Sequence, residues 1–124
     1  MGWTIRPEGL HRVITQAHER YKLDAVYITE NGAAFEDARE GNAVHDDYRK
    51  SYLQSHTAAP LRAKAEGIPV KGFFARSLMD NFERALRYSK RSGIIYVDYS
   101  TQERIVKDSG RSYGELARSG APER

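Results

Sequence analysis

Apolar residues recur at helical spacing near the start of the chain and then fill two short, nearly continuous runs. Residues 8–21 are predicted to form an amphipathic helix that ends before Leu23. The run at 25–29 is too short and too rich in β-branched residues for a helix, and it predicts a buried parallel strand, as does the apolar run at 68–75. The helix is predicted from these apolar positions: Leu10, Val13, Ile14 and Ala17.

A long helix is predicted between the two strands, from Asp46 to Glu66, and Gly67 closes it. Pro60 lies in the interior of this segment and has no backbone N–H to donate, so we expect it to kink or split the helix. Two apolar strands separated by a helix form the pattern of a right-handed βαβ unit with a parallel pair of strands.

The last third of the chain predicts smaller elements. Residues 78–88 combine a turn with a helical piece, and residues 94–99 and 104–106 form a small hairpin around a polar turn. Asp108 is predicted to cap a final helix that reaches about Arg118. Residues 119–124 are expected to be frayed, so residues 1–118 make up the one folded unit.

The composition of the 124 residues is that of a soluble globular segment, with 40% hydrophobic and 30% charged residues. A formal net charge of +3 is a weak indication of anionic partners. The chain has no cysteine, which excludes disulfides and thiolate metal sites. No run approaches the roughly 18 apolar residues of a membrane helix, and Met1 is not followed by a signal-type apolar stretch, so the cytoplasm is the default location.

Glu30 is the first candidate for chemistry, because it stands where the strand at 25–29 opens into a loop that contains Gly32. A carboxylate at that point has a rigid support and faces a cleft, as a catalytic nucleophile or acid requires. The alternative is an ordinary turn carboxylate with no catalytic role.

The run Ile28-Thr29-Glu30-Asn31-Gly32 resembles the nucleophile motif of glycoside hydrolase family 1, whose members are retaining β-glucosidases and β-galactosidases built on a (β/α)₈ barrel. Further resemblance covers nearly the whole chain, in Met1-Gly2-Trp3, Pro7-Glu8-Gly9-Leu10, Val44-His45-Asp46, Gly72 through Glu83, Tyr88 through Arg91, Tyr96 through Tyr99 and Lys107-Asp108-Ser109. The implied fold is α/β: the last two βα units of a TIM barrel, followed by a hairpin and a C-terminal helix. A complete barrel takes about 250 residues, so one closed by this chain alone is implausible.

The resemblance implies hydrolysis of a β-linked glucoside or galactoside through a covalent intermediate on Glu30, without a cofactor. Retaining glycosidases need a second carboxyl group as acid/base, at about 5 to 5.5 Å from the first. In the family this residue lies in an Asn-Glu-Pro motif, which this sequence does not contain. We expect the motif upstream of Met1, and the upstream part of the barrel is then a possible partner.

Sugar contacts are implied at three further positions. Glu83 resembles the family residue that accepts hydrogen bonds from the distal hydroxyls of the sugar, although it could instead be a solvated helix carboxylate paired with Arg87. Arg76 and Arg84 stand where the family has tryptophan, which replaces aromatic area by charge that is costly to bury unless it is paired. Other departures lie where a small residue, Phe and Trp are usual: Arg87, Ser92 and Ser112.

The sequence leaves other functions open. The chain could be a non-catalytic remnant of an enzyme, or a small binding module that uses a basic run with Tyr88 between its cations to contact phosphates. A solvated or ion-paired face is the commoner role of such a run, and nucleic acid is an improbable partner. His45 with Asp46 and Asp47, and His11 with His18, lack the ligand spacing of a recognised metal site. The basic run consists of Arg84, Arg87, Lys90 and Arg91.

Overall fold

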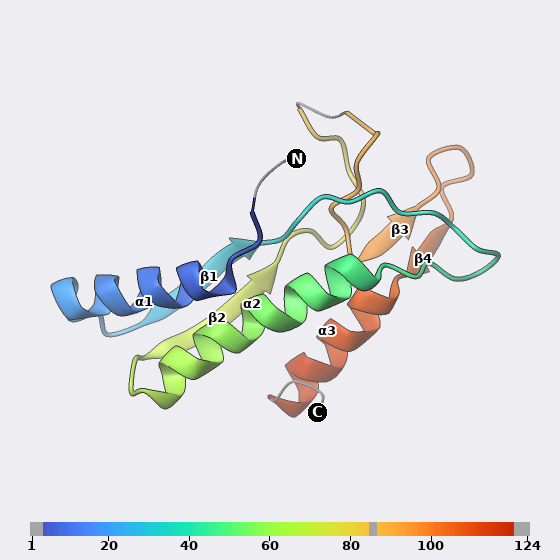
Figure 1. Ribbon diagram of the computed structural model, residues 1–124. Coiled ribbons are helices and arrows are strands. Elements are labelled where there is room, and N and C mark those ends of the chain that lie inside the picture. Colours follow the sequence, from blue (N-terminus) through green and yellow to red (C-terminus); the bar gives the residue numbers. More distant parts are fainter. Residues whose placement is uncertain (1–3, 85–86, 121–124) are drawn as a thin grey trace.

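The computed structural model describes residues 4–84 and 87–120. Two long helices lie side by side across one face of a two-stranded sheet, and a third helix packs beside the second (Figure 1). In chain order the elements are α1 (Pro7–Tyr21), β1 (Val26–Asn31), α2 (Asp47–Ala65), β2 (Val70–Ala75), β3 (Ile95–Val97), β4 (Arg104–Val106) and α3 (Asp108–Ser119).

Strands β1 and β2 pair in parallel, and α2 connects them, so the predicted βαβ unit is confirmed. Val26 lies opposite Val70 and Ile28 opposite Phe73, with irregular register toward the carboxyl ends. β2 begins two residues later than the apolar run predicts. Pro69 cannot donate to the ladder, although its carbonyl oxygen accepts from the Val26 N–H at 2.9 Å.

The hydrophobic core lies between the sheet and the helices α1 and α2. It is built around Ile14, Ala63, Ile68 and Val70. The helical spacing therefore located the inner face of α1, with one exception: Val13 is 64% exposed. The apolar face of an amphipathic helix is wider than the surface that one sheet can cover. A residue at the edge of this face therefore remains exposed to solvent.

Helix α2 continues through Pro60 as a single helix, so the expected split is wrong. Pro60 leaves the carbonyl group of His56 without its usual intrahelical donor. Both residues are buried, and the helix packs against α1, β2 and α3. Packing on three sides stabilises the helix enough to offset one missing hydrogen bond, which propensity in isolation does not predict.

The segment between β2 and β3 contains no helix in the part that the structure describes, which corrects the helical piece expected at 78–88; residues 85 and 86 lie outside the described residues. The segment is held instead by isolated bridges, from Met79 to Ile95 and from Glu83 to Arg87. Asp80 accepts from the backbone N–H of Gly93 at 3.0 Å. A side chain at Gly93 would come within 2.2 Å of the backbone of residues 79 and 80, so the two passes of chain touch directly.

The hairpin is confirmed, with β3 and β4 paired antiparallel in the register Ile95–Val106 to Val97–Arg104. Helix α3 is also confirmed, but Asp108 is its first residue rather than its cap. The Asp108 carboxylate accepts from His45 Nδ1 at 2.7 Å instead of from the helix backbone. Within the segment expected to fray, Ser119 still belongs to the helix and Gly120 is its C-cap, while residues 121–124 lie outside the described residues.

A buried network of six charged side chains joins the loop after β1, the start of α2, the segment before β3 and the residue before α3. Lys107 is fully buried and contacts Asp80 at 2.7 Å and Asp37 at 2.5 Å. Arg49 contacts Asp37 at 2.8 Å and Asp46 at 2.6 Å. Three cations and three carboxylates balance in charge, which is the condition for burying them. The six are Asp37, Asp46, Arg49, Asp80, Arg91 and Lys107.

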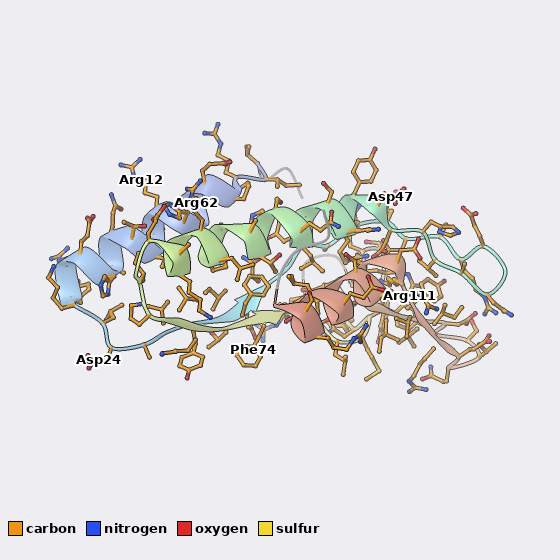
Figure 2. The ribbon with its side chains drawn as sticks, turned by 90° about the horizontal axis from the view of Figure 1, so that it is seen from below. Arg12, Asp24, Asp47, Arg62, Phe74 and Arg111 are labelled. Atoms are coloured by element: carbon orange, nitrogen blue, oxygen red, sulfur yellow. The ribbon has the colours of Figure 1, made fainter. Side chains whose placement is uncertain are left out.

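The sheet face opposite the helices is open. Phe74 points away from the helices on this face (Figure 2), and both it and Tyr27 are 56% exposed. Among the described helices, none is long and apolar enough to cross a membrane.

Candidate active site

The candidate site lies at the carboxyl ends of β1 and β2, where the chain leaves both strands. Glu30 is the last residue but one of β1, and its side chain is 68% exposed. Arg76 follows directly after β2. Because the strands are parallel, their carboxyl ends meet at one edge of the sheet and bring these residues together across 46 positions of sequence.

Gly32 allows the two strand ends to approach. A Cβ atom at this position would lie 1.8 Å from the carbonyl oxygen of Arg76, so only glycine fits. The Arg76 N–H donates to the Asn31 carbonyl oxygen at 2.9 Å, which extends the pairing beyond the strands. The glycine of the motif therefore has a packing role that its position in the sequence did not reveal.

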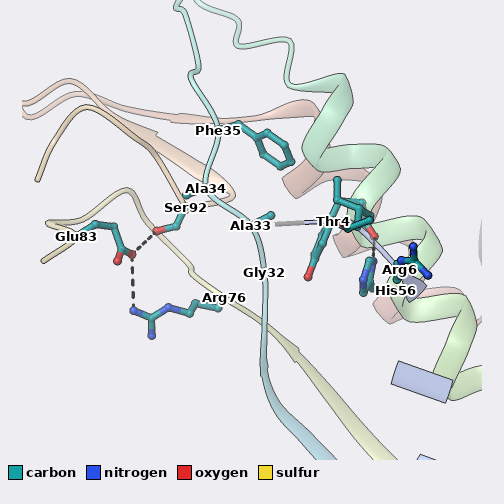
Figure 3. A pocket seen from close by; sticks show the side chains of 12 residues that line it. Thr4, Arg6, Gly32, Ala33, Ala34, Phe35, His56, Arg76, Glu83 and Ser92 are labelled. Carbon is teal, nitrogen blue, oxygen red and sulfur yellow. Dashed lines mark hydrogen bonds and ion pairs between the residues drawn. The ribbon is translucent and has the colours of Figure 1, made fainter. Parts of the chain in front are cut away.

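Arg76 connects the two candidate carboxylates. Its Nη1 lies 3.2 Å from Glu30 Oε1, and its Nη2 lies 3.8 Å from Glu83 Oε1 (Figure 3 shows the second contact). Arg76 is half-exposed, and its two partners are the residues that the resemblance places in the sugar site. The alternative pairing of Glu83 with Arg87 is not a helical one, since these residues are joined by a backbone bridge with Glu83 outside any helix.

Ser92 contributes a hydroxyl group to the site, a role that the sequence did not predict. It is buried, and its Oγ lies 3.3 Å from Glu83 Oε1 and 3.4 Å from Asn81 Oδ1. A hydroxyl group can donate to one of these acceptors and so orients the carboxylate. The sequence indicated only that the family pattern usually has an aromatic side chain at this position.

A cavity of about 360 Å³ runs from these residues past the segment at 32–35 to helix α2 (Figure 3). This volume falls within the range of about 300 to 1,000 Å³ that small-molecule sites occupy. Its wall on α2 is formed by His56 and Tyr52, whose rings stack with centroids 3.9 Å apart. Burial lowers the pKa of His56 and raises the pKa of Tyr52, so both side chains favour their neutral forms.

Arg84 is exposed and is not among the described residues that line the cavity. Arg87, at a position where the family pattern has a small residue, adopts the left-handed backbone conformation with φ of 53°. Glycine takes this conformation without cost, whereas other residues take it with some strain.

Half of the basic run is paired. Lys90 forms an ion pair with Glu36, and the Arg91 guanidinium contacts Asp80 at 2.7 Å inside the buried network. Two of the histidines that were considered as metal ligands have other partners, His45 with Asp108 and His11 with Glu66. Within residues 4–84 and 87–120, no three His, Cys, Asp or Glu side chains come together in a way that could hold a metal ion.

A parallel β-α-β unit with charged side chains at the carboxyl ends of its strands is typical of α/β proteins, both barrels and open sheets, whose sites lie at that end. The sequence pattern of glycosyl hydrolase family 1 matches residues 1–121, and the chain belongs to this family.

Curated relatives match the chain over nearly its full length. Beta-glucosidase A of Thermotoga maritima is 52% identical over 124 residues, which cover 99% of this chain and 28% of the relative. The beta-glucosidase of Agrobacterium sp. is 43% identical and is matched over 98% of this chain and 26% of its own length. The chain thus spans little more than a quarter of the relatives that it matches.

Solved structures agree with this assignment. The family 1 β-glucosidase of Thermotoga maritima in complex with isofagomine lactam superposes with a TM-score of 0.94 at 52% identity, covering 99% of this chain and 28% of that one. The fold of this chain is therefore that of a segment of a TIM-barrel β-glucosidase.

Proposed function

We propose that this chain is the nucleophile-bearing segment of a retaining β-glucosidase, made of the last two βα units of the barrel, a hairpin and the C-terminal helix. The observation that carries the proposal is the position of Glu30. It lies at the carboxyl end of a parallel strand, within a run that resembles the family's nucleophile motif, and it shares the Arg76 guanidinium with Glu83 from the segment after β2.

In this proposal Glu30 attacks the anomeric carbon of a β-linked glucoside or galactoside. The bond to the aglycone oxygen breaks as the second carboxyl group protonates that oxygen, and water then hydrolyses the glycosyl ester. Glu83, oriented by Ser92, accepts hydrogen bonds from the distal hydroxyls of the sugar. The second carboxyl group belongs to the part of the barrel outside these 124 residues.

The open sheet face supports the same assignment. Tyr27 and Phe74 are exposed on the face that does not contact the helices. Beside β2, a second cavity of about 430 Å³ is lined by residues of α2, β2 and α3, of which Leu61, Phe73 and Leu116 are apolar and Lys64 and Lys71 are charged. A sheet with open edges and an uncovered apolar face requires further strands and packing, which the rest of a barrel supplies.

The test is a chimaera in which this chain follows the upstream barrel of the Thermotoga maritima relative. The purified 124-residue chain is expected to show no hydrolysis of an aryl β-glucoside, because it holds one of the two carboxyl groups. In the chimaera carrying Arg76→Trp, Glu30→Ala should lower kcat on the order of a thousandfold or more.

Azide gives the decisive readout, because it can occupy the space that Glu30→Ala leaves and attack the anomeric carbon itself. We expect azide to restore turnover and to yield the α-glucosyl azide, and we expect no such product in Glu83→Gln, where the nucleophile remains. Activity of the chain alone that is lost in Glu30→Gln, or a chimaera whose activity survives Glu30→Ala without azide, would contradict the proposal.

A further inference from the structure

Arg76 occupies the space between two carboxylates that a bound sugar would need. Its guanidinium contacts Glu30 at 3.2 Å on one side and Glu83 at 3.8 Å on the other. If the proposed function holds, Glu30 faces the anomeric carbon and Glu83 faces the distal hydroxyls, so a sugar ring must lie between them. The guanidinium and the ring therefore compete for one position.

We propose that Arg76 closes the glycone position to neutral β-glucosides by acting as a tethered cation in place of the sugar. This inference rests on the proposed function and adds a residue that determines which substrates the site accepts. Closure acts in two ways. The planar fork fills the space between the carboxylates, and the positive charge pairs with the Glu30 oxygen that would attack the sugar.

The surroundings hold the base of this side chain and leave its end free to move. Its N–H donates to the Asn31 carbonyl oxygen at 2.9 Å, and its carbonyl oxygen packs against Gly32. The side chain itself is 46% exposed, and exposed ion pairs of this kind contribute little to stability. Arg76 therefore shields the position by occupancy and charge, and removal of the guanidinium should open it.

A second interpretation is that Arg76 recognises an anionic sugar. The contacts favour closure, because the guanidinium already points its donors at two carboxylates. The three side chains together carry a net charge of −1, which repels an incoming anion. The two interpretations predict opposite responses to a glucoside phosphorylated on its 6-hydroxyl, which makes that compound a useful probe.

The experiment compares Arg76→Ala, Arg76→Trp and Arg76→Lys in the chimaera, with Arg12→Ala on the exposed face of α1 as the matched control. We expect Arg76→Ala and Arg76→Trp to raise kcat/KM for an aryl β-glucoside about tenfold or more. Arg76→Lys should fall between, since lysine keeps the positive charge but lacks the planar fork that fills the space between the carboxylates. Arg12→Ala should match the unaltered chimaera.

Free guanidinium tests the position directly. At a concentration on the order of 100 mM it should inhibit Arg76→Ala, where it can return to the space between the carboxylates. It should inhibit Arg76→Trp less, and sodium chloride at the same concentration should inhibit neither.

Three results would overturn the inference. One is equal kcat/KM in the unaltered, Arg76→Ala and Arg76→Trp chimaeras. Another is inactivity of all variants when the same barrel with the relative's own segment is active, because removal of the guanidinium then opens nothing. The third is faster hydrolysis of the 6-phosphoglucoside by the unaltered chimaera than by Arg76→Trp, which would make Arg76 an anion receptor.

The two proposals fail in different ways. If activity is independent of Arg76 but is lost in Glu30→Ala, the inference fails and the proposed function stands. If activity rises in Arg76→Trp and survives Glu30→Ala, the proposed nucleophile is wrong while the effect of Arg76 remains.

Discussion

At the scale of single residues, the site depends on atoms that approach closely between the two strand ends. Gly32 lies against the Arg76 carbonyl group, and Ser92 lies beneath Glu83. Neither residue takes part in a proposed bond-making step. Each determines the position of a charged group, Gly32 that of Arg76 and Ser92 that of Glu83. The geometry of the site therefore depends on these small residues as well as on the carboxylates.

Gly32→Ala is expected to destabilise the chimaera by about 1–3 kcal/mol or more, because the added methyl group would meet a backbone oxygen at 1.8 Å. Urea unfolding gives the stability, and kcat/KM in the Arg76→Trp background should fall with it. Gly9→Ala is the matched control. No atom lies within 4 Å of the added methyl in α1, so stability should be unchanged or rise by about 0.5–1 kcal/mol. Equal effects of the two substitutions would contradict the packing role of Gly32.

At the scale of elements, α2 carries the connection between the two strands and contributes one wall of the cavity. Tyr52 and His56 line the cavity from this helix, as residues 32–35 do from the segment after β1. The middle of α2 contains Pro60, and proline destabilises the interior of a helix unless packing against other elements stabilises that helix. Packing on three sides is thus what keeps the helix, and with it the cavity wall, continuous.

Pro60→Ala is expected to raise the stability of the chimaera by about 1 kcal/mol. The gain of about 3 kcal/mol in helix propensity exceeds the cost of removing the buried apolar ring, which is about 1–2 kcal/mol. Ala58→Pro, at an exposed position of the same helix, is the contrasting control and should cost about 3 kcal/mol or more. Both are measured by urea unfolding. A lower stability for Pro60→Ala would mean that the packing of the ring outweighs the missing donor.

At the scale of the whole molecule, two features decide whether the parts hold together: the buried charge network and the open sheet. The network links four segments through their side chains, in addition to the backbone bridge between Phe35 and Arg91. The open sheet leaves Tyr27 and Phe74 in solvent. One feature stabilises the end of the molecule near the hairpin, and the other leaves the opposite face of the sheet without the cover that a barrel provides.

Lys107→Met is expected to destabilise the chimaera by about 3–5 kcal/mol, because it leaves Asp37 and Asp80 buried with fewer cations than carboxylates. Asp37→Asn in the same chain should recover part of the loss by restoring the balance. Lys64→Met, on the exposed side of α2, should change stability by less than about 0.5 kcal/mol. Urea unfolding at neutral pH measures all three, and a small effect of Lys107→Met would show that water reaches the network.

The isolated 124-residue chain is expected to be only marginally ordered, since open strand edges and an uncovered apolar face remove part of the 5–15 kcal/mol or so that holds a domain together. Amide exchange at residues 25–29 and 70–75 should be fast in the chain alone and slow in the chimaera. Sedimentation at low concentration separates a monomer from aggregates. A compact monomer with full protection in both segments would refute this expectation.

Local sequence was enough to predict the elements whose signals lie within a few residues. The spacing of apolar positions predicted α1, and the short β-branched runs predicted β1 and β2. The position of Glu30 after a strand, with the resemblance to the family, indicated the candidate nucleophile. The helix and the strands depend on backbone geometry and on the spacing of apolar residues, which a continuous stretch of chain contains in full.

The remaining features required contacts between segments that are distant in the chain. The pairing of Arg76 with Glu30 and Glu83, the closeness of Gly32 to Arg76 and the buried network around Lys107 bring together side chains up to 70 positions apart. The helix through Pro60 and the extended segment near Asp80 likewise depend on neighbours that override local preference. Burial and charge balance are properties of the packed molecule. The identity of a charged residue in the sequence does not show whether its side chain will be solvated, ion-paired or buried.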